Sequence, residues 1–136
     1  MSTSPGNGLR ATLAAGRFAV TAEIGPPRGA DAGAVVAKAE MLRGWVDAAN
    51  VTDNQGAHVR MGSLGASVLV QRAGVEPIMQ VTCRDRNRMA LQSDLLSAGA
   101  LGIPNVLHTF ACLLHQGTGK GGRLKGPTTR PASRSG

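Results

Sequence analysis

The 136-residue sequence predicts an α/β fold in which parallel strands alternate with helices. Four short apolar, β-prone stretches begin at residues 18, 46, 76 and 104, and segments with helical spacing of apolar residues lie between them. Such units build either a doubly wound open sheet or a (β/α)₈ TIM barrel. No Gly-rich dinucleotide turn follows the first stretch, so we expect a partial barrel of about four strands and three to four helices.

The strands are expected at residues 18–24, 46–52, 76–82 and 104–109. Their residues are apolar at successive positions, as in Val46, Ala48, Ala49 and Val51, which is typical of a sheet covered by helices. A short helix at residues 9–15 is expected to close the N-terminal end.

Three longer helices are predicted from apolar positions spaced three and four residues apart. Asp31 is a candidate N-cap for the first, and either Asp85 or Asn87 for the third. The apolar positions are, in chain order, Val35, Ala39 and Leu42; Met61, Leu64, Val68 and Leu69; and Leu91, Leu95 and Ala98. Each helix is expected to end at a glycine, Gly44, Gly74 or Gly102, because glycine adopts the left-handed conformation at low cost.

The charge divides the chain into two parts. Residues 1–108 hold ten Lys or Arg and all eight acidic residues, a balance of +2, whereas residues 109–136 hold five basic residues and no acid. The tail is also rich in Gly, Pro, Ser and Thr, a composition typical of disorder. We therefore predict a folded unit over residues 1–109 and a disordered basic tail over 110–136.

The basic tail raises a rival function, that of a small non-enzymatic protein binding polyanions or nucleic acid. The nearly neutral body and an aromatic content of 2% make nucleic acid an improbable partner, since base-stacking surfaces need aromatic side chains. Deleting residues 110–136 is expected to abolish any weak, salt-sensitive binding in a DNA titration and to leave the strand–helix part unaffected. Tight binding that survives the deletion would favour the rival.

The compartment is predicted from what the chain lacks. No apolar run approaches the roughly 18 residues of a membrane span, and the N-terminus has no charged region leading into an apolar one. Cys83 and Cys112 match no metal-ligand or disulfide spacing, and the three histidines show no metal-ligand pattern. We expect a cytoplasmic protein without a metal site or membrane contact.

Candidate site residues lie where the predicted strands end, because barrel chemistry sits at the carboxyl ends of the strands. Glu23 interrupts an apolar strand just before Pro26-Pro27. Flanked by Ala22 and Ile24, its carboxyl group is expected to be partly desolvated, which suits a general acid; pairing with a neighbouring arginine is the structural alternative. Thr52 and Gln80 could hold a ligand ring, or could be a turn threonine and a buried amide.

Charged and thiol groups near these ends have two interpretations each. Residues 84–88, Arg-Asp-Arg-Asn-Arg, could bind an anion such as a pyrophosphate or form a solvated loop that caps the next helix. Asp53 is either a catalytic carboxylate or an Asx-turn residue. Cys83, which Arg84 follows, is either a thiol of lowered pKa or a structural thiol, and the structural thiol is expected because no histidine occupies a telling position in the sequence.

Four segments are distinctive: FAVTAEIGPPR at residues 18–28, VDAANVTDN at 46–54, QVTCRDRNRMALQSDLL at 80–96 and ALGIPNVL at 100–107. In this order and spacing they resemble the N-terminal part of methylenetetrahydrofolate reductase, over about residues 9–107. The resemblance implies a FAD-dependent TIM barrel of one-carbon and methionine metabolism. Such a barrel reduces 5,10-methylenetetrahydrofolate to 5-methyltetrahydrofolate with electrons from a nicotinamide nucleotide or another donor.

The resemblance also implies roles for three residues. Glu23 matches the general acid that assists opening of the methylene bridge of the folate. Thr52 matches a threonine beside the flavin ring, and Gln80 lies where the family has a flavin-contacting residue, often His. Metal ligands are not implied.

The chain departs from the family pattern after Leu107. The family continues with Leu-Thr-Gly-Asp, whereas this chain has His108, Thr109 and Phe110 and then becomes basic. We therefore expect a truncated or frame-shifted chain of weak or no activity, with a natural short protein carrying a disordered tail as the alternative. Translation of the other two frames downstream of the Leu107 codon would distinguish the two. Four strands leave an open edge and a half-covered core, so the fold is expected to be marginal; whether a homo-oligomer or a partner subunit completes it is left open.

Overall fold

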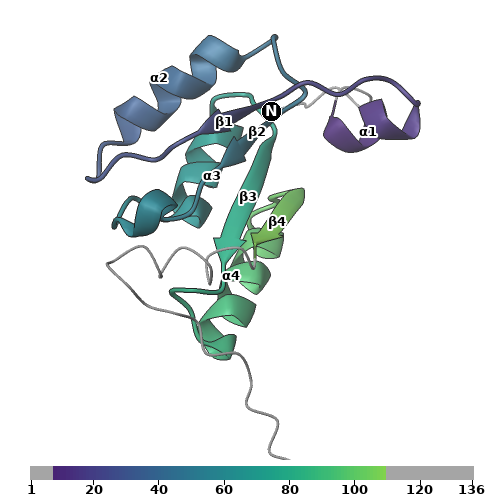
Figure 1. Ribbon diagram of the computed structural model, residues 1–136. Helices are drawn as coiled ribbons and strands as arrows, with labels where there is room; N and C mark the ends of the chain where they lie inside the picture. The colour runs from purple at the N-terminus through teal and green to yellow at the C-terminus, as the bar shows by residue number, and fades with distance from the viewer. Residues whose placement is uncertain (1–7, 110–136) are drawn as a thin grey trace, which may run out of the picture.

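The computed structural model describes residues 8–109, and the tail predicted to be disordered lies outside them. Four strands and four α-helices alternate along this part of the chain, with one 3₁₀ turn (Figure 1). In order they are α1 (Leu9–Ala14), β1 (Thr21–Ile24), α2 (Ala32–Leu42), β2 (Ala48–Val51), η1 (Gln55–Ala57), α3 (Ser63–Arg72), β3 (Pro77–Thr82), α4 (Arg88–Ala100) and β4 (Asn105–Thr109).

The elements agree with those predicted, although each strand begins one to three residues later than expected. Two of the apolar helix positions are wrong, because Met61 precedes α3 and Leu95 of α4 is exposed. Asp31 caps α2 through an Oδ1 that accepts from the Ala34 N–H at 3.1 Å. Asn87, not Asp85, caps α4, with its Oδ1 accepting from the Ala90 N–H at 2.9 Å. Gly44, Gly74 and Gly102 follow the three helices at φ values of 85°, 87° and 72°, conformations that a side chain would strain.

The sheet is parallel, and its strand order β1-β2-β3-β4 follows the chain. Strands pair in a continuous register in which Ala22 lies opposite Ala49 and Glu23 opposite Asn50. A doubly wound sheet would reverse its strand order and carry helices on both faces. The sequential order is that of a barrel segment.

One face of the sheet packs against all three long helices. Side chains alternate between the faces of a strand, so Ile24 and Val51 share a face with Ala49. These three form a core cluster with Val35 of α2 and Val70 of α3, all essentially inaccessible to solvent. Met79 and Val81 of β3 continue the same face and pack against α4 and the residues after it, through Ala98 and Ile103.

The opposite face carries mostly polar or partly exposed side chains, although Ala48 and Thr82 on it are buried. Its residues are, strand by strand, Thr21 and Glu23; Ala48 and Asn50; Ile78, Gln80 and Thr82; and Asn105, Leu107 and Thr109. In a closed barrel this face lines the interior. Because the helices cover only the other face, the face that would line the interior of a closed barrel is left open in the described strands.

Helix α1 ties the starts of the strands together, as the sequence predicted for residues 9–15. In Figure 1 it lies beside the strand starts, away from the arrowhead of β3. The Leu9 N–H donates to Glu76 Oε1 at 3.1 Å, and Asn105 Nδ2 donates to the same oxygen at 2.7 Å. Asp47 accepts from Thr12 Oγ1 at 2.9 Å and from the Val20 N–H at 2.8 Å.

These contacts predict an acid-sensitive docking of α1. The Val20 N–H, the Thr12 hydroxyl and the charge of Arg17 hold the pKa of Asp47 below its ordinary value of 3.8. Because the pKa of Asp47 is lower in the folded protein than in the unfolded one, its ionised form stabilises the fold at pH values above the unfolded-state pKa. This stability is lost as the pH falls through the folded-state pKa. The urea midpoint of the wild type should therefore exceed that of Asp47→Asn at pH 6, and the gap should close below about pH 4. A gap that stays constant with pH would show that the ionised form of Asp47 contributes nothing.

Candidate functional site

The three predicted site residues lie at the carboxyl ends of neighbouring strands. Glu23 is in β1, Thr52 follows β2 directly, and Gln80 is in β3. Glu23 and Gln80 belong to the open face, where Asn50 lies opposite Glu23 in the register. The structure therefore brings the candidates to one end of one face, as expected for a barrel site.

Glu23 is exposed in the described part of the chain, so the expectation that Ala22 and Ile24 would desolvate its carboxyl group is wrong. Ala22 and Ile24 adjoin it in sequence but point to the helix-covered face, because side chains alternate along a strand. Its carboxylate has one described hydrogen bond, from Gln55 Nε2 to Oε1 at 3.5 Å, a long and weak contact. No arginine pairs with Glu23 within residues 8–109, so the structural alternative finds no support either.

Thr52 is buried, with 2% of its surface exposed, and its hydroxyl is not used by the described protein. The backbone N–H of Thr52 continues the strand ladder by donating to the Ile24 carbonyl at 3.1 Å. The Oγ1 atom has no hydrogen-bond partner in the described part of the chain, although it is shielded from water. A buried hydroxyl without a partner is costly, which makes this oxygen a candidate contact for a bound group.

Gln80 is half-buried, and α3 fixes the position of its backbone. Ser63, the first residue of α3, donates its hydroxyl to the Gln80 carbonyl at 2.6 Å. The side chain of Gln80 belongs to the open face, in register with Leu107 of β4. The amide can both donate and accept hydrogen bonds, which suits the edge of a heteroaromatic ring.

Two further residues belong to this site and were not predicted. Asn50 lies on the open face beside Glu23, and its Oδ1 is buried without a partner among the described residues. Gln55 contacts Glu23, and both its Oε1 and Thr52 Oγ1 lie 3.8 Å from the position that a Cβ on Gly25 would occupy. The signal for Asn50 was present in the sequence, because it interrupts an apolar strand at the position matching that of Glu23.

The Asp53 side chain is fully buried in an ion pair, a structural role that neither the catalytic nor the Asx-turn interpretation included. Arg86 donates to both carboxylate oxygens, through Nη1 to Oδ2 and through Nη2 to Oδ1. The backbone N–H and the hydroxyl of Thr82 donate to Oδ2, each at 3.0 Å. Arg86 also donates from Nε to Asp94 of α4 at 2.7 Å. This network, the Asp53–Arg86 clamp, joins the loop after β2 to β3 and α4.

The charges around Arg84 are also balanced within the loop, as the helix-capping alternative implied. Arg84 donates to Asp85 through Nε and Nη2, at 2.8 and 2.7 Å, and to the Asn54 carbonyl at 3.1 Å. The Arg84 side chain lowers the pKa of Asp85. Burial alone would lower the pKa of Arg86, but the Asp53 and Asp94 carboxylates outweigh it and raise that pKa. Both arginines are occupied internally, which disfavours a pyrophosphate site there.

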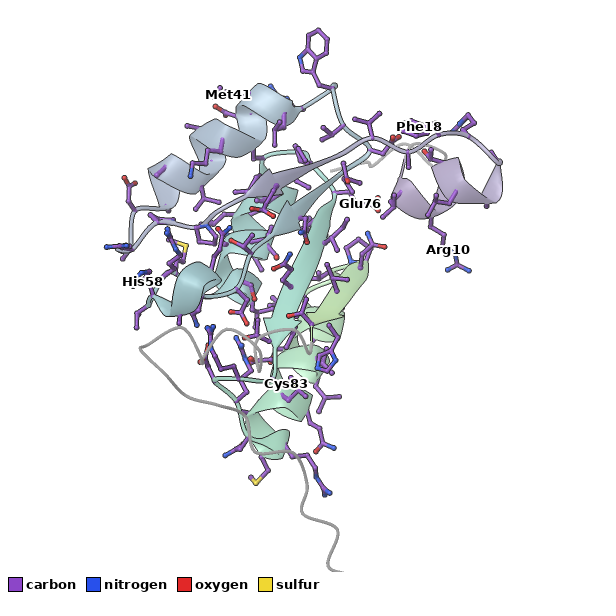
Figure 2. All side chains as sticks on the ribbon, in the orientation of Figure 1. Arg10, Phe18, Met41, His58, Glu76 and Cys83 are labelled. Atoms are coloured by element: carbon purple, nitrogen blue, oxygen red, sulfur yellow. The ribbon has the colours of Figure 1, made fainter. Side chains whose placement is uncertain are left out.

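Cys83 lies against a histidine, and the expectation that no histidine would be near it is wrong. Its Sγ is 3.0 Å from His108 Nε2, and Figure 2 shows Cys83 beyond the end of β3. The sequence concealed this contact because 25 residues separate the two and only the pairing of β3 with β4 joins them. Within residues 8–109 no group of three or more His, Cys, Asp or Glu side chains could hold a metal ion.

Three features identify the class of fold: the order of the strands, the helices on one face, and the polar residues at the carboxyl ends of the strands. The described chain is a segment of a parallel βα-barrel, with polar side chains at the carboxyl ends of its strands. The family model for methylenetetrahydrofolate reductase matches residues 8–110, more than half of the chain, and the chain belongs to that family. No curated protein matches the sequence. None of the helices described between residues 8 and 109 is long and apolar enough to cross a membrane.

Proposed function

We propose that this chain forms one side of the active site of a FAD-dependent methylenetetrahydrofolate reductase. The observation that carries the proposal is the family match over residues 8–110, together with the convergence of Glu23, Thr52 and Gln80 at one end of the open face. The substrate would be 5,10-methylenetetrahydrofolate, and the electron donor a nicotinamide nucleotide or another reductant. A cytoplasmic enzyme of one-carbon metabolism fits this assignment.

The described residues fit one side of a flavin. The buried Oγ1 of Thr52 and Oδ1 of Asn50 have no partner in residues 8–109, and hydrogen bonds to a bound ring would satisfy both. Gln80 offers a donor and an acceptor on the same face. Bound FAD would supply hydride transfer, and these three side chains would hold and orient its ring.

Glu23 would act as the general acid on the folate. Opening the five-membered ring requires a proton on a weakly basic nitrogen, which a neutral carboxylic acid can donate. Glu23 is exposed in the described chain, but a ligand lying over the open face would remove water from it and favour its protonated form. Gln55, whose Nε2 lies 3.5 Å from Glu23 Oε1, would orient the carboxyl group.

The test is a completed barrel, in which residues 8–107 of this chain are joined in frame to the later strands of another reductase of the family. This protein is expected to bind FAD and to reduce methylenetetrahydrofolate, as followed by flavin absorbance and product formation. The intact donor reductase is the control. A folded chimera that binds no flavin, or that binds flavin without reducing the folate, would contradict the proposal.

The 136-residue chain alone is expected to bind FAD weakly and to show little or no activity, because residues 8–109 supply four strands of a barrel that closes with eight. Flavin fluorescence titrations and a reductase assay on the purified chain measure this. Purification of the chain with stoichiometric yellow flavin would refute the expectation.

A further inference from the structure

Two arginines, Arg28 and Arg60, line an open surface cavity at the same end of the sheet. The cavity has a volume of about 330 Å³ and lies between the loop that follows β1 and the segment that precedes α3. It is lined by Arg28, Gly29, Ala30, Arg60 and Met61. None of these residues belongs to the candidate site described above.

Hydrogen bonds from α2 and from the segment before α3 hold the loop that carries Arg28. Three successive carbonyls accept hydrogen bonds: Gly25 from Lys38 Nζ at 2.8 Å, Pro26 from Arg60 Nη1 at 2.9 Å, and Pro27 from the Met61 N–H at 2.8 Å. The two prolines also restrict the backbone directly. The cavity wall is therefore pre-organised, which lowers the entropic cost of binding a ligand.

The positive charge at this cavity is not neutralised by the described protein. Neither Arg28 nor Arg60 forms an ion pair within residues 8–109, in contrast to Arg84 and Arg86. The Nε atom of Arg60 is buried and has no hydrogen-bond partner there. Asp31, the acid nearest in sequence to Arg28, accepts from the Ala34 N–H as the cap of α2. A partly buried guanidinium with an unused donor favours an anion.

We propose that this cavity binds the phosphate group of a phosphorylated small molecule, with the guanidinium groups of Arg28 and Arg60 as its ligands. Guanidinium forks match the oxygens of a phosphate, and a phosphate dianion gains more from two positive charges than a single carboxylate does. The volume is at the lower end of the roughly 300–1,000 Å³ of small-molecule sites, so part of the attached molecule fits as well. The proposal does not depend on Glu23, Thr52, Gln80 or the reductase assignment.

Inorganic phosphate, pyrophosphate and glutarate are the probes, each titrated into the ¹⁵N-labelled 136-residue chain. The buffer contains about 0.15 M NaCl, where the Debye length is about 8 Å and diffuse attraction to the basic tail is screened. Phosphate and pyrophosphate are expected to shift the amide signals of Gly29 and Ala30, which line the cavity. Glutarate should produce smaller shifts, because it offers separate monoanionic carboxylates.

Arg28→Met is expected to weaken phosphate binding about tenfold or more, the usual effect of losing a hydrogen bond to a charged group. Arg28 is exposed, so this variant should fold. Arg60→Lys keeps the charge but loses the fork, and should also weaken binding. Arg72→Met, which removes an exposed arginine from the end of α3, is the matched control and should bind as the wild type does.

Three results would overturn the proposal. Shifts confined to residues 120–134 would place the binding on the tail, and equal weakening by Arg28→Met and Arg72→Met would show a general charge effect. Glutarate binding as tightly as phosphate would make the site one for carboxylates. Because the readout is binding at named amides, a catalytically inactive chain still tests this site.

Discussion

Replacing Glu23 with Gln in the completed barrel is expected to slow reduction of methylenetetrahydrofolate by roughly two to four orders of magnitude, the usual contribution of a general acid. Glutamine keeps the size and the hydrogen-bonding capacity of the side chain, including an acceptor for Gln55 Nε2, but has no proton to transfer. Reduction of the flavin by its donor needs no proton from this residue. That half-reaction should therefore be almost unchanged.

Stopped-flow measurement of the two half-reactions separates this role from a structural one. If Glu23 merely supports the loop that ends in Pro26-Pro27, the substitution should harm both half-reactions together and lower the stability of the protein. Gln55→Ala is the matched comparison, because it removes the long hydrogen bond that orients Glu23 and leaves the acid in place, so it should slow the folate step far less than Glu23→Gln. Equal losses in both half-reactions, or a small loss in the folate step, would show that Glu23 is not the acid.

Breaking the Asp53–Arg86 clamp is expected to have the largest effect on stability. Asp53→Asn should reduce the free energy of unfolding by about 3–5 kcal/mol, because it leaves a partly buried guanidinium short of its main partner. The new amide also turns a donor toward the donors of Arg86. Arg86→Met should cost a similar amount, since the Asp53 carboxylate, fully shielded from solvent, would lose its counter-charge. Urea denaturation of the 136-residue chain measures both.

The double variant Asp53→Asn/Arg86→Met should lose less than the sum of the two single losses, because neither partner is then left as an unpaired charge. Asp85→Asn is the control. It breaks the ion pair with Arg84, in which the Asp85 side chain is 38% and the Arg84 side chain 7% exposed, but Arg84 keeps its hydrogen bond to the Asn54 carbonyl. The loss should therefore be smaller than for Asp53→Asn. A loss below about 1 kcal/mol for Asp53→Asn would show that the clamp is dispensable.

The secondary structure was predictable because its signals are local. Asp31 and its apolar partners at helical spacing specify α2, and Gly74 marks the end of α3. The parallel order of the strands follows from the repeat of about 29 residues, since each crossover helix returns the chain in the same direction. The location of Glu23, Thr52 and Gln80 at one end of the sheet follows from the same repeat.

The contacts between side chains were not predictable, because they join residues that are distant in the chain. Asp53 and Arg86 are 33 residues apart, and which of several arginines would neutralise this carboxylate depends on the packing of α4. The exposure of Glu23 was misjudged for a different reason. Its sequence neighbours were treated as its surroundings, whereas its neighbours in space are Asn50 across the strands and Gln55 from the next loop.

The Asp53–Arg86 clamp also shows that one strand–helix repeat is too short to fold this part of the candidate site by itself. Each strand–helix unit is about 29 residues long, yet the loop that carries Thr52 is anchored by Thr82 of β3 and, through Arg86, by Asp94 of α4. A fragment that stops after α3 lacks all three anchors. The Asp53 side chain beside Thr52 therefore gains its partners only when the third unit has docked. A module transferred by recombination would need three consecutive units to keep this anchor of the site intact.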